Sequence, residues 1–141
     1  MKSFATIVVL VVTAALYFSF NDQVECTIAI ENIKGKEGKL VIAVFDNEDD
    51  YLKNDLLNKE VVVTGKPTEL VKLKLPRGEY AIAVFHDING NKELDKNMVG
   101  WPQEAFGFSN KSLGMFGPPS FKETKFTVPS SSPIKVKLKH L

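Results

Sequence analysis

The stretch HDINGNKELDKNMVGWP, from His86 to Pro102, carries side-chain oxygens at alternate positions, as does a loop wrapped around a calcium ion. Calcium takes about six to eight oxygen ligands in proteins. The order Asp, Asn, Asn at alternate positions matches the first half of an EF-hand loop. The stretch therefore predicts a calcium site, with five candidate ligands: Asp87, Asn89, Asn91, Glu93 and Asp95.

The second half of this stretch departs from the EF-hand pattern. Counting from Asp87, the sixth position is Lys92 instead of glycine, and the twelfth is Met98 instead of a bidentate glutamate. No helical pattern flanks the stretch. An ion-free turn is the alternative, because Asp and Asn side chains accept hydrogen bonds from backbone two residues on, and Asn89-Gly90 is a strong turn-forming pair. Both hypotheses remain open.

A third hypothesis is a hydrolase, in which His86 is the base and Asp87 or Glu104 supplies a carboxylate. Neighbouring residues on a strand point to opposite faces, so His86 and Asp87 are not expected to form a dyad. The chain has only two histidines, which excludes a three-histidine metal centre, and no serine lies in a nucleophile motif. We predict that the protein is not an enzyme.

A long segment rich in aromatic, glycine and proline residues runs from Trp101 to Phe121. Connections this long are usually functional or disordered, and aromatic side chains argue against disorder because each gains roughly 1.5 to 3 kcal/mol when covered. We expect either a cap folded over one end of the domain or an exposed surface for a protein, peptide or glycan ligand. The candidate ligand surface comprises His86, Trp101, Phe106, Phe108 and Phe116.

The elements that must position these residues have the patterns of short strands. Strict alternation places Val71, Leu73 and Leu75 on one face of their strand. The first two strands are expected to form a hairpin, and residues 50–58 a loop with one turn. The absence of a long helix predicts a seven-stranded antiparallel β-sandwich, transthyretin-like or immunoglobulin-like, with a long aromatic loop. The seven segments are Cys26–Ile33, Lys39–Phe45, Glu60–Thr64, Thr68–Leu75, Glu79–His86, Phe121–Val128 and Ile134–His140.

Residues 1–24 are predicted to be a hydrophobic signal peptide or a membrane anchor. Their apolar run, from Phe4 to Phe20, is slightly long for a signal-peptide core and slightly short of the roughly 20 residues of a comfortable span. We therefore expect an exported protein, periplasmic, cell-surface or secreted, with residues 25–141 as one β-sandwich domain. Cys26 is the only cysteine and is expected to face the core, so stability must come from packing.

Charge narrows the class of partner. Lys and Arg number 18 and Asp and Glu 17, giving a formal net charge of +1, which argues against nucleic acid. Contact with a membrane is expected only through the N-terminal segment, if it is uncleaved. The alternating lysines of the last predicted strand are a candidate polyanion site, but lysines also protect solvated strand faces and edges from aggregation. Calcium is the one cofactor that the sequence indicates.

Three short motifs carry a resemblance to a known family. They are His-Asp-Ile-Asn-Gly-Asn at 86–91, Gly-Phe-Ser-Asn at 107–110 and Gly-Pro-Pro-Ser-Phe at 117–121, and they occur in order. Over about residues 25 to 140 the chain is similar to the exported bacterial family called domain of unknown function 2141. The resemblance implies a β-sandwich related to transthyretin-like and carboxypeptidase-regulatory-like domains, without an assigned activity. Lys92 departs from this family's pattern, which often has glycine there.

These observations predict an exported, non-enzymatic β-sandwich module that binds a ligand or partner, with calcium as a candidate stabiliser of its loop. The alternatives are a purely structural or accessory domain with a metal-free loop, and a hydrolase using His86 and Asp87 or Glu104.

Overall fold

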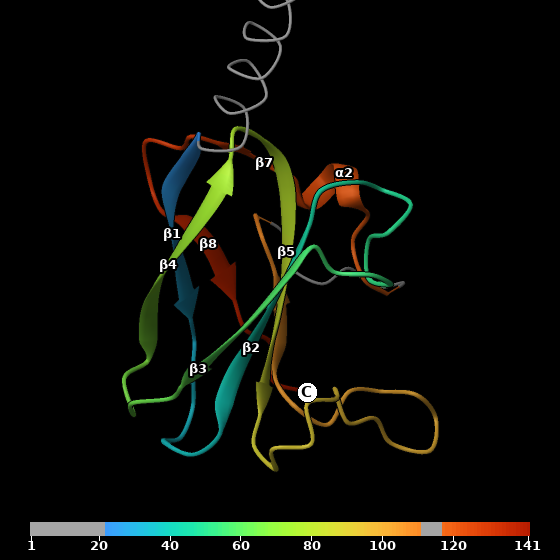
Figure 1. Ribbon diagram of the computed structural model, residues 1–141. Coiled ribbons are helices and arrows are strands. Elements are labelled where there is room, and N and C mark those ends of the chain that lie inside the picture. The colour runs from blue at the N-terminus through green and yellow to red at the C-terminus, as the bar shows by residue number, and fades with distance from the viewer. Residues whose placement is uncertain (1–21, 111–116) are drawn as a thin grey trace, which may run out of the picture.

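The computed structural model of the chain describes residues 22–110 and 117–141. The predicted leader up to residue 21 and the candidate ligand residue Phe116 therefore lie outside the described residues. Within the described ranges, eight strands and one short helix form the fold (Figure 1). Their bounds are β1 Gln23–Glu31, β2 Lys39–Phe45, β3 Leu57–Val62, β4 Thr68–Pro76, β5 Gly78–Asp87, β6 Phe106–Phe108, α2 Phe121–Thr124, β7 Phe126–Val128 and β8 Ile134–Lys137.

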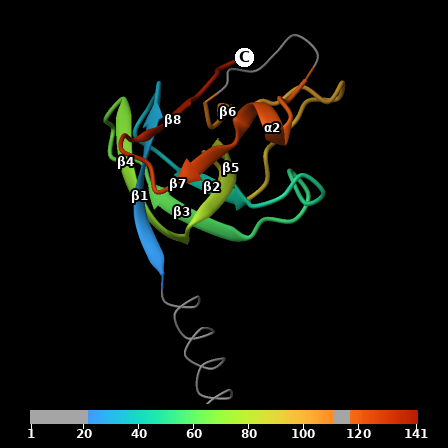
Figure 2. The same cartoon turned by 90° about the horizontal axis from the view of Figure 1, so that it is seen from above.

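The strands form two sheets that pack as a sandwich (Figure 2). One sheet has the order β4-β1-β8, and the other has the order β3-β2-β5-β6, with β7 paired to β5. The predicted all-β class is confirmed. The predicted count of seven strands and the purely antiparallel arrangement are wrong, because β6 is an additional strand and β1 pairs with β8 in parallel. No helix in the described ranges, 22–110 and 117–141, has the length and apolar character needed to cross a membrane.

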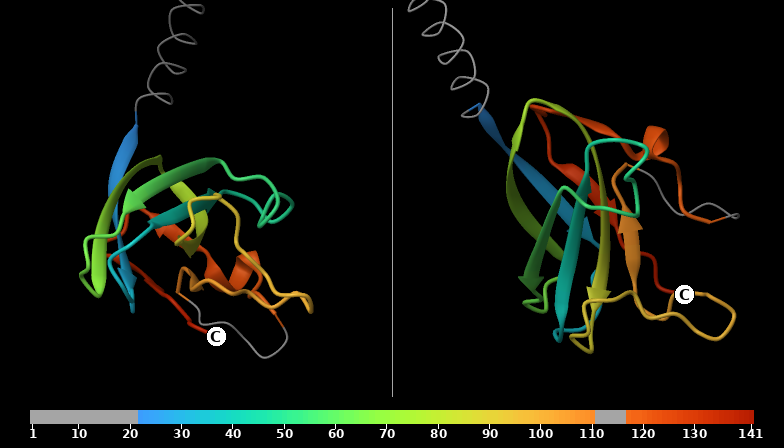
Figure 3. Two further views of the ribbon diagram at one scale, coloured as in Figure 1. Left: turned by 90° about the horizontal axis from the view of Figure 1, so that it is seen from below. Right: turned by 45° about the vertical axis from the view of Figure 1, so that its right-hand side comes forward.

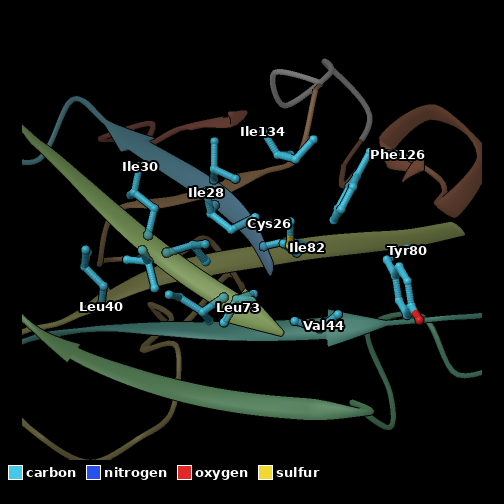
Figure 4. Packing of buried hydrophobic residues seen from close by; sticks show 14 of the residues in the cluster. Cys26, Ile28, Ile30, Leu40, Val44, Leu73, Tyr80, Ile82, Phe126 and Ile134 are labelled. Atoms are coloured by element: carbon cyan, nitrogen blue, oxygen red, sulfur yellow. The ribbon is translucent and has the colours of Figure 1, made fainter. Parts of the chain in front are cut away.

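Alternation along the strands fills the space between the two sheets with apolar side chains (Figure 4). On β4, Val71, Leu73 and Leu75 are buried as predicted, while Leu70 is exposed. Each fully buried aliphatic side chain contributes roughly 1.5 to 3 kcal/mol. The Cys26 side chain is also buried, which confirms its predicted place in the core, and this burial raises the pKa of its thiol.

The predicted hairpin between the first two strands is wrong. β1 pairs with β4 over its whole length, whereas β2 pairs with β3 and β5 in the opposite sheet. The connection between β1 and β2 crosses from one sheet to the other, and its backbone has positive φ at Asn32, Gly35 and Gly38. Glycine readily adopts positive φ, so Gly35 and Gly38 mark a crossover between the sheets and not a hairpin turn.

Two other segments differ from the predicted strands. Residues 121–128 contain α2 and then β7, because Ser120 and Glu123 form a capping box: Glu123 N–H donates to Ser120 Oγ, and Ser120 N–H donates to the Glu123 carboxylate. β3 begins at Leu57 instead of Glu60. The single turn predicted within residues 50–58 is confirmed by the bond from Asn54 N–H to the Asp50 carbonyl.

Candidate functional site

The candidate site is the connection between β5 and β6, which emerges at one end of the sandwich (Figure 3). β5 delivers His86 and Asp87 to this end with both side chains 2% exposed. The backbone N–H of His86 donates to the Ala105 carbonyl at 2.8 Å, so the chain leaves the sheet and re-enters it at neighbouring points. The connection is therefore a closed loop anchored at its base.

Asp87 organises the first turn of this loop. Its Oδ1 accepts a hydrogen bond from Gly90 N–H and its Oδ2 accepts one from Lys92 N–H, both at 2.9 Å. The turn places Gly90 at φ 76° and Lys92 at φ 63°, in the left-handed region that favours glycine. Lys92 thus adopts the backbone conformation that the glycine of a calcium loop would take, and its amide is held by the Asp87 carboxylate.

Asp95 closes the turn from its other side. Its two carboxylate oxygens accept hydrogen bonds from the side-chain amides of Asn89 and Asn91. The amide oxygens of the same asparagines accept backbone N–H groups two residues on, from Asn91 at 3.1 Å and Glu93 at 3.0 Å. These are the local Asx bonds expected of an ion-free turn.

Glu104 joins the two ends of the loop. Its side chain is 8% exposed; Oε1 accepts Ile88 N–H at 3.1 Å and Oε2 accepts Asp95 N–H at 3.3 Å. Sequence reasoning considered Glu104 only for a hydrolase and missed this role. No local signal in the sequence could have indicated it, because both partners lie at least nine residues away.

The histidine does not pair with either carboxylate. His86 Nε2 lies 2.7 Å from the Glu37 carbonyl oxygen and donates to it. Within the described ranges, no hydrogen bond joins His86 to Asp87 or Glu104, and every buried side-chain nitrogen or oxygen has a partner. The prediction that His86 and Asp87 form no dyad is consistent with these separate partners.

Four of the five predicted calcium ligands, Asp87, Asn89, Asn91 and Asp95, are brought into one turn. Glu93 is exposed and contributes only its backbone N–H to the hydrogen bonds of the turn. In the part of the chain that the structure describes, no three His, Cys, Asp or Glu side chains are grouped as metal ligands. An oxygen set here would depend on the asparagine amides, and calcium binding stays a prediction.

An ion-pair network fastens the loop to the sheet. Lys92 Nζ lies 3.3 Å from Glu60 Oε1 on β3, and Lys39 Nζ on β2 lies 2.8 Å from Glu60 Oε2. Hydrogen bonds from Lys39 and then Lys92 lower the pKa of Glu60, and Glu60 in turn raises the pKa of Lys39. Both lysines are exposed and Glu60 is only half-buried, so solvent screens these pairs and they contribute little to the stability of the fold.

Beyond Asp95 the chain forms a small projection, residues 96–102, which we call the tip. Lys96 and Pro102 form an isolated bridge, and Asn97 N–H donates to the Trp101 carbonyl at 2.8 Å. The Asn97 side-chain oxygen accepts N–H groups from Val99 and Trp101, each at 3.0 Å. Three apolar side chains project from this ordered backbone: Met98, which is fully exposed, Val99 at 76% and Trp101 at 55%.

The predicted ligand surface is divided by the structure. Trp101 is exposed on the tip, but His86, Phe106 and Phe108 are all buried, and Phe116 lies outside the described residues. Phe106 and Phe108 belong to β6 and pack edge to face with ring centroids 6.0 Å apart. Phe106 and Phe108 are thus buried as part of the sheet and not as a cap over one end, and ligand binding by the exposed part stays a prediction. Met98 and Val99, which sequence reasoning left out, replace the buried phenylalanines on the exposed part.

A comparison with family models matches residues 28–137 to the family described as "Uncharacterized protein conserved in bacteria (DUF2141)". The chain belongs to the DUF2141 family. The matched DUF2141 region runs from within β1 to the end of β8 and includes both the Asx-rich turn and the tip. Comparisons with curated proteins and with solved structures gave no significant match.

Proposed function

We propose that this DUF2141 chain is an exported, non-enzymatic module that binds a protein, peptide or glycan partner through the tip. The observation that carries the proposal is the joint exposure of Met98, Val99 and Trp101 on a backbone held by Asn97. Exposed apolar side chains gathered on a polar surface are typical of interaction sites. A tip that is already ordered loses little conformational entropy on binding, which favours affinity.

The burial of the candidate catalytic groups supports a non-enzymatic function. His86, Asp87 and Glu104 are exposed by 2%, 2% and 8%, and their polar atoms bond backbone groups of the protein itself. A general base must come within hydrogen-bond reach of a substrate proton. Groups so enclosed serve the loop as structural supports.

The apolar run from Phe4 to Phe20 supports an envelope location. β1 begins at the end of the sandwich opposite the β5–β6 connection (Figure 1). A strand of this length spans roughly 30 Å at about 3.3 Å per residue. The start of β1 and the tip therefore lie at opposite ends of the sandwich. We also propose that the sandwich is related to transthyretin-like domains.

Calcium in the turn is a second candidate, favoured by the placement of oxygen atoms from Asp87, Asn89, Asn91 and Asp95 in one turn. To bind the ion, Asp95 would exchange its two amide hydrogen bonds for metal coordination. Calcium at a hundredfold excess over its Kd would stabilise the fold by about 2.7 kcal/mol. Thermal melts in millimolar calcium and in chelator test this: a higher midpoint with calcium supports the ion, and coincident midpoints support the metal-free turn.

Trp101 provides the direct test of binding, because it is the only tryptophan and is about half exposed. Its emission should shift to shorter wavelength when a defined peptide or oligosaccharide from a soluble panel covers the tip. Met98→Ala should weaken that response, whereas Leu70→Ala, which removes another exposed apolar side chain, on β4, should not. A panel without any emission response, or a response unchanged by Met98→Ala, would contradict the proposal.

A further inference from the structure

A hollow of about 260 Å³ opens between β6, the end of β8 and the connection that follows β1. Its lining includes the buried rings of Phe106 and Phe108 and three exposed lysines, Lys34, Lys137 and Lys139, which we call its rim. β6 and β8 lie side by side here, since Phe106 and Lys139 exchange backbone hydrogen bonds at 3.2 and 2.7 Å. The hollow is separate from the tip and from the groups that close the Asx-rich turn.

The described lining of the hollow has a net positive charge. Its described lining contains three lysines and His140 but no Asp or Glu. Elsewhere in the described chain, Lys39, Lys72, Lys92, Lys125 and Arg77 form ion pairs, whereas these three rim lysines form none with a described acidic residue. Three cations around a concave surface whose described lining has no acidic side chain attract an anion.

Backbone packing builds this hollow before any ligand arrives. Gly107 brings β6 against β8 so closely that a Cβ atom there would lie 2.6 Å from the Lys137 carbonyl oxygen. Asn32 Nδ2 donates to the Leu138 carbonyl at 2.7 Å, and His140 Nε2 donates to the Asn32 carbonyl at 2.7 Å. These bonds fix the segment bearing Lys34 beside the C-terminal segment.

Strand alternation places the lysines on one side. Lys137 and Lys139 are two residues apart, so both point away from the core, roughly 6.6 Å from each other along the strand. A second hollow of about 440 Å³ adjoins the first, shares Phe108 and Lys137 with it, and adds Lys135 together with Glu31. The acidic group in the second hollow makes the first the stronger anion site.

We propose that the first hollow binds a small organic anion. A carboxylate or phosphate group would meet Lys34, Lys137 and Lys139, and a sugar or apolar ring would lie toward Phe106 and Phe108. The volume lies just below the usual range for ligand pockets, about 300 to 1,000 Å³, which limits the ligand to roughly one sugar ring. Lysine ammonium groups act as point charges, so they bind either a carboxylate or a phosphate without the bidentate geometry of arginine.

The test is calorimetric titration of the full chain with glucuronate, glucose 6-phosphate and uncharged glucose. Binding of at least one anion, with none for glucose, is expected, and the preferred anion identifies the group recognised. Lys137→Gln with Lys139→Gln should weaken this binding at least tenfold. The double variant Lys66→Gln and Lys74→Gln makes the same charge change at exposed sites outside the hollow and should bind as the unchanged chain does.

Three results would overturn the proposal: no binding of either anion at 10 mM, equal binding of glucose, or equal weakening in both double variants. Unfolding midpoints of the variants show that any loss is not a loss of fold, since all four lysines are exposed. Trp101→Ala should leave anion binding unchanged, which separates this site from the proposed partner surface of the tip.

Discussion

Replacement of Asp87 tests whether its carboxylate organises the β5–β6 connection. The side chain is 2% exposed and accepts two backbone N–H groups at 2.9 Å. A hydrogen bond to a charged group contributes about 1.5 to 3 kcal/mol. Gly90 and Lys92, the donors, are exposed, so water recovers part of the loss, and Asp87→Ala should lower the free energy of unfolding by about 2 to 4 kcal/mol.

Asp87→Asn refines this prediction because an amide has one oxygen and can accept from only one of the two donors in this geometry. Asp87→Asn should lower the free energy of unfolding by about half as much as Asp87→Ala, roughly 1 to 2 kcal/mol. The assay is urea unfolding at 25 °C, with amide hydrogen exchange at Gly90 and Lys92 as the local measure. Asp55→Ala, at an exposed position, is the control and should stay within about 0.5 kcal/mol of the unchanged chain. An Asp87→Ala variant as stable as this control would refute the reasoning.

Three further predictions follow from close packing, burial and charge. Gly107→Ala places a Cβ 2.6 Å from the Lys137 carbonyl and should destabilise the fold by about 1 to 3 kcal/mol in urea unfolding; a neutral effect would show that β6 and β8 are not in close contact. The Cys26 thiol, buried and with a raised pKa, should react with a disulfide reagent at least tenfold more slowly in the folded chain than in urea, and equal rates would contradict its burial. Lys39→Met should raise the lowered pKa of Glu60, as measured by an NMR titration. Because the pKa of Glu60 is depressed in the folded chain, the ion pair stabilises the fold above the ordinary glutamate pKa, and this stabilisation is lost as the pH falls through the folded pKa. An unchanged pKa of Glu60 in the variant would show that Lys39 does not lower it.

The strands that are best predicted from the sequence are those with one face in the core and the other in water. Residues 68–75 alternate because one face of β4 packs on the core and the other faces water. The hairpin prediction failed because the glycines after β1 permit a crossover as readily as a tight turn, and pairing with β4 depends on residues far along the chain. β6 is three residues long, too short to show a period, and its pairing with β5 is visible only in three dimensions.

The candidate site was predictable where its bonds are local. Asx bonds from Asn89 and Asn91 follow from residue type and spacing, and the turn contains four of the predicted ligands. The clamp by Glu104 and the link from Lys92 to Glu60 join residues distant in sequence, so no local pattern indicates them. The aromatic segment is divided between buried and exposed residues, because β6 adds to the sheet edge while none of the described strands covers the tip.

Site-specific photocrosslinking in bacterial cells is the most direct test of the proposed binding surface. A photoreactive side chain at Val99, 76% exposed on the tip, is compared with one at Leu70, 67% exposed on β4. The account predicts a discrete crosslinked adduct at Val99, whose mass spectrum identifies a protein, peptide or glycan, and no such adduct at Leu70. The absence of an adduct at Val99, or the same adducts at both positions, would contradict it.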